Sequence, residues 1–489
     1  MILISAEYLI FLTSIIIIVL GLKIRQLQIA FLLIASYYFY LVSNDYRILS
    51  LVFSSAVTYY CGNAIYRTSS QNKKKFYLAL ALFGALGQLA VFKYYNFAVD
   101  LLNQISSPFG HWTPIQATSL VIPIGISFYT FQSLSYVFDI YRGDLKAARS
   151  FYEYALFVAF FPQITSGPII RARVFLTQLW HKTSISIESQ NLKYGLTLIG
   201  IGLVKKMVLA DNIGPYVDTV FSHPAYFNSL RIILATIAFG IQLYCDFSGY
   251  SDIAIGIARI LGFVFPPNFN NPYLATDPSD FWTRWHISLS SFLRDYLYIP
   301  LGGNRKGELR TYLNLMITMT LCGFWHGAAW NFIIWGAYHG SLLSIQRLLS
   351  EGLLIRGRLG NTLKNPLLKA PRILITQYFI FFGWLIFRAD SLDNMIYCMN
   401  KFIFPDFFSR ITYLSLVYGF LNEMKIYIVA LSLYILLLAF YRDRFCKVDW
   451  VTFISSLKLR YWTLFLIIVI LIIAWFSPST SSRFIYSAF

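Results

Sequence analysis

The amino-acid sequence predicts an all-α protein that crosses a lipid bilayer many times. Of its 489 residues, 57% are hydrophobic and only 13% are charged, whereas a soluble domain carries roughly 25% charged residues. Uncharged stretches, close to the roughly 17 to 25 residues that a membrane helix needs, recur along the whole chain. We expect about ten to twelve membrane helices from these stretches, which cover 8–22, 27–44, 48–66, 76–92, 119–138, 154–170, 232–245, 311–346, 373–387, 426–441 and 461–477.

Several of these helices are expected to be broken or re-entrant around a central tunnel. Broken helices are tolerated inside a membrane mainly where they are buried in protein or line a cavity. The first apolar stretch has no basic segment before it and no cleavage pattern, so we expect it to remain as a helix. Prolines and glycines interrupt two of the other stretches, at Pro123, Gly125, Pro162, Gly167 and Pro168.

The lysines and arginines behind the net charge of +18 are concentrated in particular loops, so the charge does not indicate nucleic-acid binding. Basic residues gather in loops separated by two apolar stretches, while the loop at 96–118 contains no lysine or arginine. Because basic loops tend to stay in the cytoplasm, this alternation places both chain ends outside. The lipid bilayer is therefore an expected partner of the chain, and nucleic acid is not.

The sequence gives no sign of a metal or nucleotide site. Its five cysteines and six histidines form no C-x-x-C, H-x-x-x-H or H-E-x-x-H pattern, and such spacings are typical of zinc sites. Phosphate-binding glycine motifs and the G-x-S-x-G element of hydrolases are also missing. We expect neither a metal nor a permanently bound cofactor.

The longest uncharged stretch, Thr311 to Gln346, is interrupted at its centre by Cys322-Gly323-Phe324-Trp325-His326-Gly327. Basic residues on both sides of the stretch predict a helical hairpin that enters the membrane and returns. At 1.5 Å per helical residue, His326 lies roughly 22 Å along the first arm, in a hydrocarbon core about 30 Å thick. One long tilted helix is the alternative, and it would move the 347–372 loop outside against the charge rule.

An imidazole at this depth is a functional-site hypothesis by default. Gly323 and Gly327 let another backbone or a substrate approach closely, which disfavours the alternative of a buried histidine bonded to a carbonyl. His339, in Tyr338-His339-Gly340, is interpreted as a helix-packing residue, with a chemical role as the alternative.

A further histidine lies in the segment before the hairpin. Residues 276–280 supply cap-type side chains and a proline that predict a helix start. Trp282, His286 and Leu289 then recur at helical spacing, so we expect an amphipathic helix at the cytoplasmic interface that ends at Pro300. From the pattern alone, His286 is either a polar residue at the headgroup boundary or a site residue.

Two carboxylates occur in apolar surroundings, at Asp246 and Asp252. Carboxylates are rare inside membranes and suggest a functional cavity. The alternative is a structural ion pair between one of them and Arg259, seven residues beyond Asp252.

The two histidine segments, FWTRWHISLSSFLRDYLYIPLGGNR at 281–305 and CGFWHGAAWNFIIWGAYHG at 322–340, closely resemble the membrane-bound O-acyltransferase family, in particular its branch of alginate O-acetyltransferase membrane subunits. The resemblance covers most of residues 90–350, and Phe324 stands where a leucine is common. Upstream it extends through the segments at 92–97, 123–132, 161–163, 166–168 and 242–252.

The resemblance implies transfer of an acetyl group from a cytoplasmic thioester to hydroxyls of an exported polysaccharide such as alginate, in a bacterial inner membrane. It implies that His326 is the essential catalytic residue and that His286 is the second site. Acetyl coenzyme A or an acyl carrier protein would be the donor, and an extracytoplasmic or periplasmic transferase the partner. Residues 399–423 are a candidate docking surface for that partner, with a half-buried interfacial helix as the alternative. The single domain would comprise N-terminal helices (1–90), a catalytic core (91–350) and C-terminal helices (351–489).

The chemistry agrees with this implication. Ester formation needs a base for the hydroxyl proton and donors for the oxyanion. A neutral imidazole suits the first task, and a low-dielectric site disfavours its charged form. Oxyanion donors are expected in the backbone at 323–328 or in the indoles of Trp325 and Trp330. Further candidates for the substrate tunnel are Trp285, Arg284, Asp246 and Asp252.

Other functions are compatible with parts of the pattern. Within the same chemistry, the alternatives are D-alanyl transfer to teichoic acid and O-acetylation of peptidoglycan. A transporter of a polymer or small molecule also has broken helices and buried acids, but it does not explain the tryptophan-histidine motifs. A non-catalytic scaffold that recruits an enzyme on the outer face is a third possibility.

Overall fold

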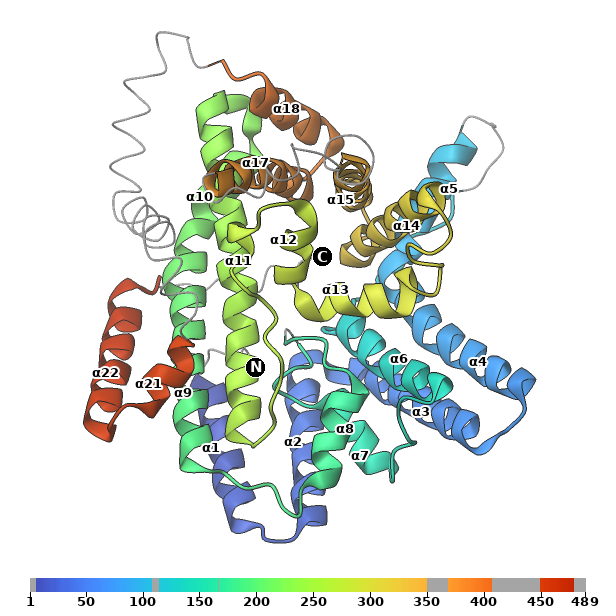
Figure 1. Cartoon of the computed structure of the whole chain (residues 1–489), viewed down its shortest axis with the longest axis vertical. Helices are drawn as coiled ribbons and strands as arrows, with labels where there is room; N and C mark the ends of the chain where they lie inside the picture. Colours follow the sequence, from blue (N-terminus) through green and yellow to red (C-terminus); the bar gives the residue numbers. More distant parts are fainter. Residues whose placement is uncertain (1–5, 108–113, 166, 350–367, 407–448, 479–489) are drawn as a thin grey trace.

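The computed structural model describes residues 6–107, 114–165, 167–349, 368–406 and 449–478. Within these residues all regular secondary structure is helical, with no strand. The longest α-helix, α11 (Ser229–Ile260), has 32 residues and runs through the middle of the molecule (Figure 1). The predicted all-α fold class is confirmed.

The N-terminal helices follow the first apolar stretches of the sequence. They are α1 (Ala6–Gly21), α2 (Arg25–Asn44), α3 (Ile48–Arg67) and α4 (Gln71–Leu89). A π-helical turn, Ala90–Tyr94, continues α4 into α5 (Tyr95–Ser106). Such a turn contains one extra residue per hydrogen-bonded loop and is frequent at functional sites.

The two predicted interruptions are real and lie against each other. α6 (Ile126–Arg142) begins only after Gly125, and α7 (Phe151–Ala159) ends before Pro162; α8 (Ala172–His181) follows. Gly125 has a φ of +79°, and a Cβ there would lie 2.2 Å from the carbonyl oxygen of Ile164. Glycine is therefore needed both for its backbone conformation and for the close approach of the second break.

The helical stretch before α11 was not predicted from uncharged segments, because lysines and an aspartate interrupt it. It comprises α9 (Ser189–Leu203), a π-helical turn (Val204–Ala210) and α10 (Asp211–Ser222). α9 packs against α11 where a Cβ on Gly195 would lie 2.5 Å from the carbonyl oxygen of Gly256. Small residues allow two helix backbones to approach this closely.

The charges that interrupt this stretch pair with the two carboxylates of α11. Lys206 contacts Asp246 at 2.7 Å and Asp211 at 2.5 Å, and all three side chains are buried. Lys205 contacts Asp252 at 2.6 Å. The alternative of a structural ion pair is correct in kind, but Arg259 is not the cation. The Arg259 guanidinium lies over the Tyr194 ring, 5.2 Å from its centroid. The cations come from the neighbouring π-helical turn, which sequence spacing did not reveal.

The prediction of one helix that starts at 276–280 and ends at Pro300 is wrong. The chain forms α12 (Pro278–Arg284) and α13 (Ile287–Leu293), followed by a π-helical turn (Arg294–Tyr298). His286 separates the two helices with a φ of +43°, which no α-helix contains. α12 and α13 lie between α11 and the hairpin described next (Figure 1).

The predicted hairpin is confirmed. α14 (Glu308–His326) and α15 (Trp330–Leu348) run antiparallel, since a Cβ on Gly323 would lie 2.1 Å from the carbonyl oxygen of Phe332 and one on Gly336 would lie 2.3 Å from that of Met319. α17 (Lys369–Arg388) packs along α15, with Asn331 bonded to the carbonyl oxygen of Phe387 and Tyr338 to that of Phe379, and α18 (Leu392–Ile403) packs against α17 and α11. α21 (Trp450–Ser456) and α22 (Leu459–Phe476) lie beside α9.

Five helical stretches in the described part of the chain are long and apolar enough to cross a membrane. They are Arg25–Arg67, Gln71–Ser106, Ser229–Ile260, Lys369–Arg388 and Leu459–Phe476, with Glu7–Gly21 as a shorter apolar helix. The predicted ten to twelve spans exceed this number, and α14 and α15 are not among the five. The expected span at 426–441 and most of the candidate docking surface at 399–423 lie outside the described residues.

The buried ion triad generates a stability prediction. In Lys206→Met, two buried carboxylates lose their cation, and we expect a loss of about 3–5 kcal/mol. Lys205→Met is the matched control, because its pair with Asp252 is partly exposed, and we expect a loss of about 1 kcal/mol or less there. Thermal unfolding of the detergent-purified chain measures both. Equal losses in the two variants would show that burial does not govern the contribution of these pairs.

Candidate functional site

His326 is the last residue of α14, at the tip of the hairpin. The helix ends here because Gly327 is extended, with φ −164° and ψ 155°, and Ala329 is extended as well. A Cβ on Gly327 would lie 2.1 Å from the Phe332 ring, so glycine permits the tight turn into α15. His326 is buried, with 4% of its surface exposed.

The surroundings of His326 are almost entirely aromatic. Its ring centroid lies 4.9 Å from Trp325, 5.2 Å from Trp335 and 5.4 Å from Phe387, with each pair close to edge-on. The Sγ atom of Cys322, one turn earlier, lies 4.0 Å from Nε2. Aromatic rings and a thiol are therefore close neighbours of the imidazole.

The carbonyl groups at the end of α14 are capped by two side chains from the π-helical turn at Ala90–Tyr94. Lys93 Nζ donates to the carbonyl oxygens of Trp325 at 2.8 Å and His326 at 2.7 Å. Tyr94 Oη donates to that of Phe324 at 2.8 Å. Sequence reasoning missed this contact, although Lys93 and Tyr94 lie in the segment at 92–97 that takes part in the family resemblance.

His286 reaches the same aromatic cluster from the break between α12 and α13. Its ring lies 6.2 Å from that of Trp325 and 4.6 Å from that of Phe247 on α11. Only 1% of its surface is exposed, so the headgroup-boundary interpretation is wrong. Trp325 contacts both His286 and His326, so these three predicted site residues lie together.

The orientation of His286 depends on Asn268, which sequence reasoning also missed. Asn268 Oδ1 lies 3.3 Å from His286 Nδ1 and accepts from Ser288 Oγ at 2.8 Å, while its amide donates to Ser251 of α11 at 3.1 Å. Nε2 of His286 has no hydrogen-bond partner among the described residues. The left-handed backbone at His286 is a strained conformation for a non-glycine residue, which is common at functional sites.

The remaining predicted site residues lie elsewhere. Trp285 is buried and its ring lies 4.7 Å from that of Trp384, which makes it part of the aromatic wall behind the site. Trp330 is 45% exposed and packs against Phe97 at 5.8 Å. Asp246 and Asp252 belong to the ion pairs beside the π-helical turn at Val204–Ala210.

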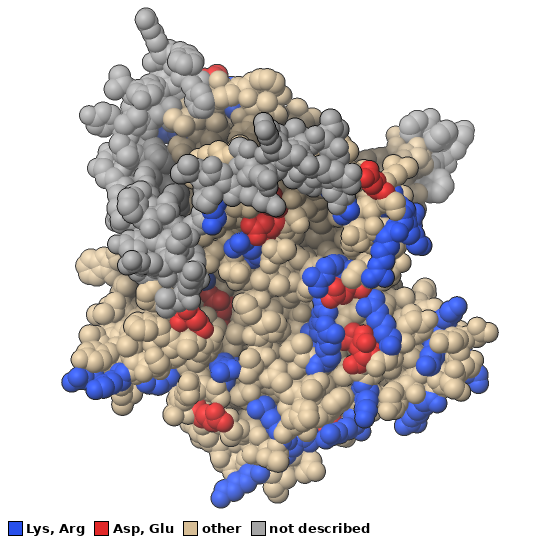
Figure 2. Space-filling model, viewed as in Figure 1, with Lys and Arg blue, Asp and Glu red and all other residues tan. Residues whose placement is uncertain are grey.

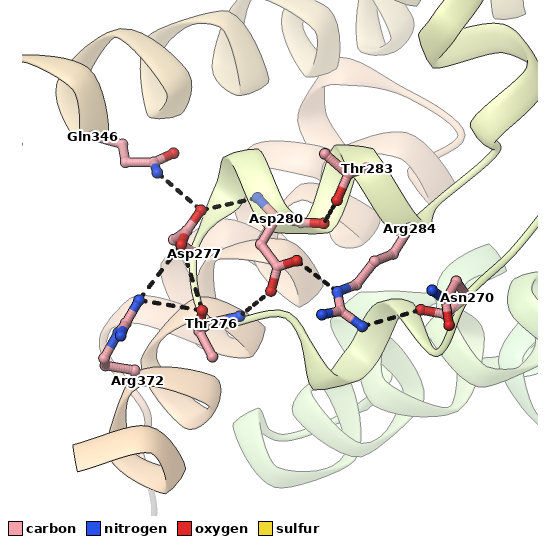
Figure 3. Close-up of polar contacts among 8 residues, drawn as sticks. All are labelled: Asn270, Thr276, Asp277, Asp280, Thr283, Arg284, Gln346 and Arg372. Carbon is pink, nitrogen blue, oxygen red and sulfur yellow. Dashed lines mark hydrogen bonds and ion pairs between the residues drawn. The ribbon is translucent and has the colours of Figure 1, made fainter. Parts of the chain in front are cut away.

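Arg284 belongs to a polar network that fastens α12 (Figure 3). Its guanidinium contacts Asp280 at 2.6 Å and the carbonyl oxygen of Asn270 at 3.4 Å. Asp277, at the start of α12, accepts from Gln346 at 2.9 Å and lies 3.5 Å from Arg372. The network joins α12 to the end of α15 and the start of α17.

His339 is fully buried on α15 between two tryptophan rings, with Trp335 at 4.8 Å and Trp282 at 5.2 Å. This position agrees with its interpretation as a packing residue. Within the described residues, neither of its ring nitrogens has a hydrogen-bond partner. The described part of the chain also contains no group of three or more histidine, cysteine or acidic side chains that could hold a metal ion.

Two pockets lie at successive positions along the hairpin, before and after His326. The larger, of about 660 Å³, is lined by Leu315, Thr318, Met319 and Cys322 of α14, by Ser290, Ser291 and Arg294, and by Gln346 and Arg347 of α15. The smaller, of about 280 Å³, is lined by Ala328, Trp330 and Asn331 at the hairpin tip, by Phe97, Asp100 and Gln104 of α5, and by Asp390.

The chain matches known proteins over the region that contains this site. A model of the membrane-bound O-acyltransferase family matches residues 146–353. The chain is 43% identical to a probable alginate O-acetylase of Azotobacter vinelandii, over 74% of this chain and 70% of the relative. It is 36% identical to a peptidoglycan O-acetyltransferase of Helicobacter pylori (75% and 72%) and 30% identical to a teichoic acid D-alanyltransferase of Bacillus subtilis (59% and 74%).

The glycine contact of the hairpin generates a prediction. In Gly323→Ala the new methyl group would meet the backbone of α15, which cannot move aside as a side chain can, so we expect a loss of about 1–3 kcal/mol. Gly87→Ala, in α4 with no atom within 4 Å of its Cβ position, is the control and should be neutral or stabilising by up to about 1 kcal/mol. Melting temperatures of the two variants measure the difference. An unchanged melting temperature of Gly323→Ala would contradict the tight hairpin.

Proposed function

The chain belongs to the membrane-bound O-acyltransferase family, and we propose that it passes an acetyl group from a cytoplasmic thioester to a hydroxyl of an exported polysaccharide. The observation that carries this proposal is the position of His326 between two pockets. Residues 315–322 of α14 line the larger pocket, His326 follows on the next turn, and residues 328–331 line the smaller one. His326 itself lines neither pocket, but Cys322 in the larger and Ala328 in the smaller lie close to it in the chain, and we propose that a donor and an acceptor approach the imidazole from these two sides.

The larger pocket suits the thioester donor. Its volume lies within the roughly 300–1,000 Å³ typical of ligand sites. Arg294 and Arg347 line it at the end of the hairpin that the charge rule assigns to the cytoplasm. Lysine and arginine side chains gather over α13 and the start of α14 on the face seen in Figure 2. Guanidinium groups bind phosphates, which coenzyme A and the prosthetic arm of an acyl carrier protein both contain.

In the proposed reaction, His326 takes the proton of the acceptor hydroxyl while the hydroxyl oxygen attacks the carbonyl carbon of the thioester. A carbon–oxygen bond forms, the carbon–sulfur bond breaks, and the imidazolium returns the proton to the departing sulfur. The reaction therefore needs no oxidant and releases no net proton. Cys322, whose Sγ lies 4.0 Å from His326 Nε2, lines the larger pocket and connects it to the imidazole.

The tetrahedral oxyanion needs preorganised donors. Trp325 Nε1 and His286 Nε2 are buried and have no hydrogen-bond partner among the described residues. Their rings lie next to each other, and Trp325 also contacts His326. We assign the oxyanion contact to Trp325 and a substrate-orienting role to His286, with the backbone N–H groups after Gly327 as further donors.

We place the smaller pocket on the acceptor side and the chain in a bacterial plasma membrane. A pocket of about 280 Å³ holds a terminal group better than a polymer chain, which supports delivery to the polysaccharide by an extracytoplasmic partner. Alginate is the first candidate acceptor, because several of the relatives are probable alginate O-acetylases. Peptidoglycan O-acetylation and D-alanyl transfer are the alternatives that other relatives favour.

The assignment of His326 is tested in membranes supplied with radiolabelled acetyl coenzyme A. We expect His326→Ala to lower ester-linked label on outer-face acceptors by about 10²–10⁴-fold, because general-base catalysis contributes that much. His181→Ala, at the exposed end of α8, is the control and should keep full activity. Equal label with and without His326 would favour the scaffold. Label in neither would direct the assay to an acyl carrier protein donor.

The donor pocket is tested by filling it. Leu315→Trp adds a large ring inside the larger pocket, and we expect the donor KM to rise about tenfold or more, because the thioester loses part of its binding space. Leu313→Trp, two residues earlier on a surface that is 46% exposed, is the matched control. Initial rates against donor concentration separate the two variants. A normal donor KM in Leu315→Trp would place the donor elsewhere.

A further inference from the structure

Lys93 is a buried cation at the site that no step of the proposed reaction uses. Only 9% of its surface is exposed. Its hydrogen bonds in the described residues go to the carbonyl oxygens of Trp325 and His326. Burying an ammonium group is costly unless it is compensated. Here the compensation comes from backbone carbonyls and not from a carboxylate.

The end of α14 explains why a cation fits this position. The last four carbonyl groups of a helix have no partner within it, and together they give the helix end a partial negative charge of about half an electron. Many helices satisfy these groups with a glycine in the left-handed conformation. Gly327 is extended instead, so that solution is not used here.

The π-helical turn at Ala90–Tyr94 supplies the donors that a left-handed glycine cap would otherwise provide. It places Lys93 and Tyr94 side by side, so that three successive carbonyl groups, those of Phe324, Trp325 and His326, each receive a side-chain donor. The Tyr94 ring also stacks on Phe324, with centroids 4.1 Å apart. Two of the three capped residues are those whose side chains form the site.

We propose that Lys93 is a positioning residue for acyl transfer: by fixing the carbonyl groups of Trp325 and His326, it sets the directions in which the indole and the imidazole leave the last turn of α14. The proposal rests on the assignment of His326 as the base. It also connects the site to the acceptor side, because α5 continues from the same turn to line the smaller pocket with Phe97 and Asp100.

The expected kinetic effect distinguishes positioning from simple structural support. In Lys93→Met the carbonyl groups lose their donor while the apolar stem remains, and we expect kcat to fall about 10²-fold, as misplacing a reacting group by about 1 Å does. The donor KM should change little, because Lys93 does not line the larger pocket. Lys93→Arg keeps charge and donors and should recover much of kcat.

The experiment measures kcat, donor KM and melting temperature for Lys93→Met, Lys93→Arg and Tyr94→Phe, with Lys205→Met as a lysine control outside the site. Tyr94→Phe removes one hydrogen bond and should lower kcat less than Lys93→Met. A Lys93→Met chain with kcat within about threefold of the intact protein, or with a raised donor KM alone, overturns the proposal.

Two further outcomes are decisive. If Lys93→Met does not fold and Tyr94→Phe has normal kcat, the contact is structural only and the proposal fails. His326→Ala is measured in the same membranes to separate this failure from that of the proposed function. Full activity in His326→Ala overturns the function itself, whereas its loss together with normal Lys93→Met activity overturns only the role of Lys93.

Discussion

The end of α14 inside the molecule is the constraint on which the rest of the site depends. Carbonyl groups cannot remain without hydrogen bonds in apolar surroundings, so an interior helix end requires donors from elsewhere in the chain. Lys93 and Tyr94 supply them from a turn more than 200 residues away. The N-terminal helices, the hairpin and the imidazole of His326 are therefore positioned together.

Aromatic rings pack against both histidines, whereas the two carboxylates of α11 pair with Lys205 and Lys206. This separation has a chemical reason. An unpaired carboxylate near His326 would stabilise the imidazolium and weaken the base, whereas rings exclude water and leave the imidazole neutral. The indole of Trp325 can still donate a hydrogen bond from such a wall.

The sequence predicted the fold class, the hairpin and the two proline–glycine breaks, because apolar length, basic flanks and breaker residues are local signals. It did not predict the break at His286, where helical spacing of apolar residues continues although the backbone does not. Lys93 and Asn268 were missed for a different reason. Their places at the site depend on contacts with residues far along the chain, which no spacing pattern records. For the same reason, the alternative of an ion pair at the α11 carboxylates named Arg259 in place of Lys205 and Lys206.

The close packing of the hairpin argues for a fixed site and against a transporter. Alternating access requires one group of helices to rock against another around the bound substrate. At Gly323 and Gly336 the backbones of α14 and α15 are so close that not even a methyl group fits between them, and Lys93 ties the hairpin tip to a further helix. A polymer could not pass between such helices. The proposed reaction at one imidazole, with two small groups approaching it from the two pockets, needs no such movement.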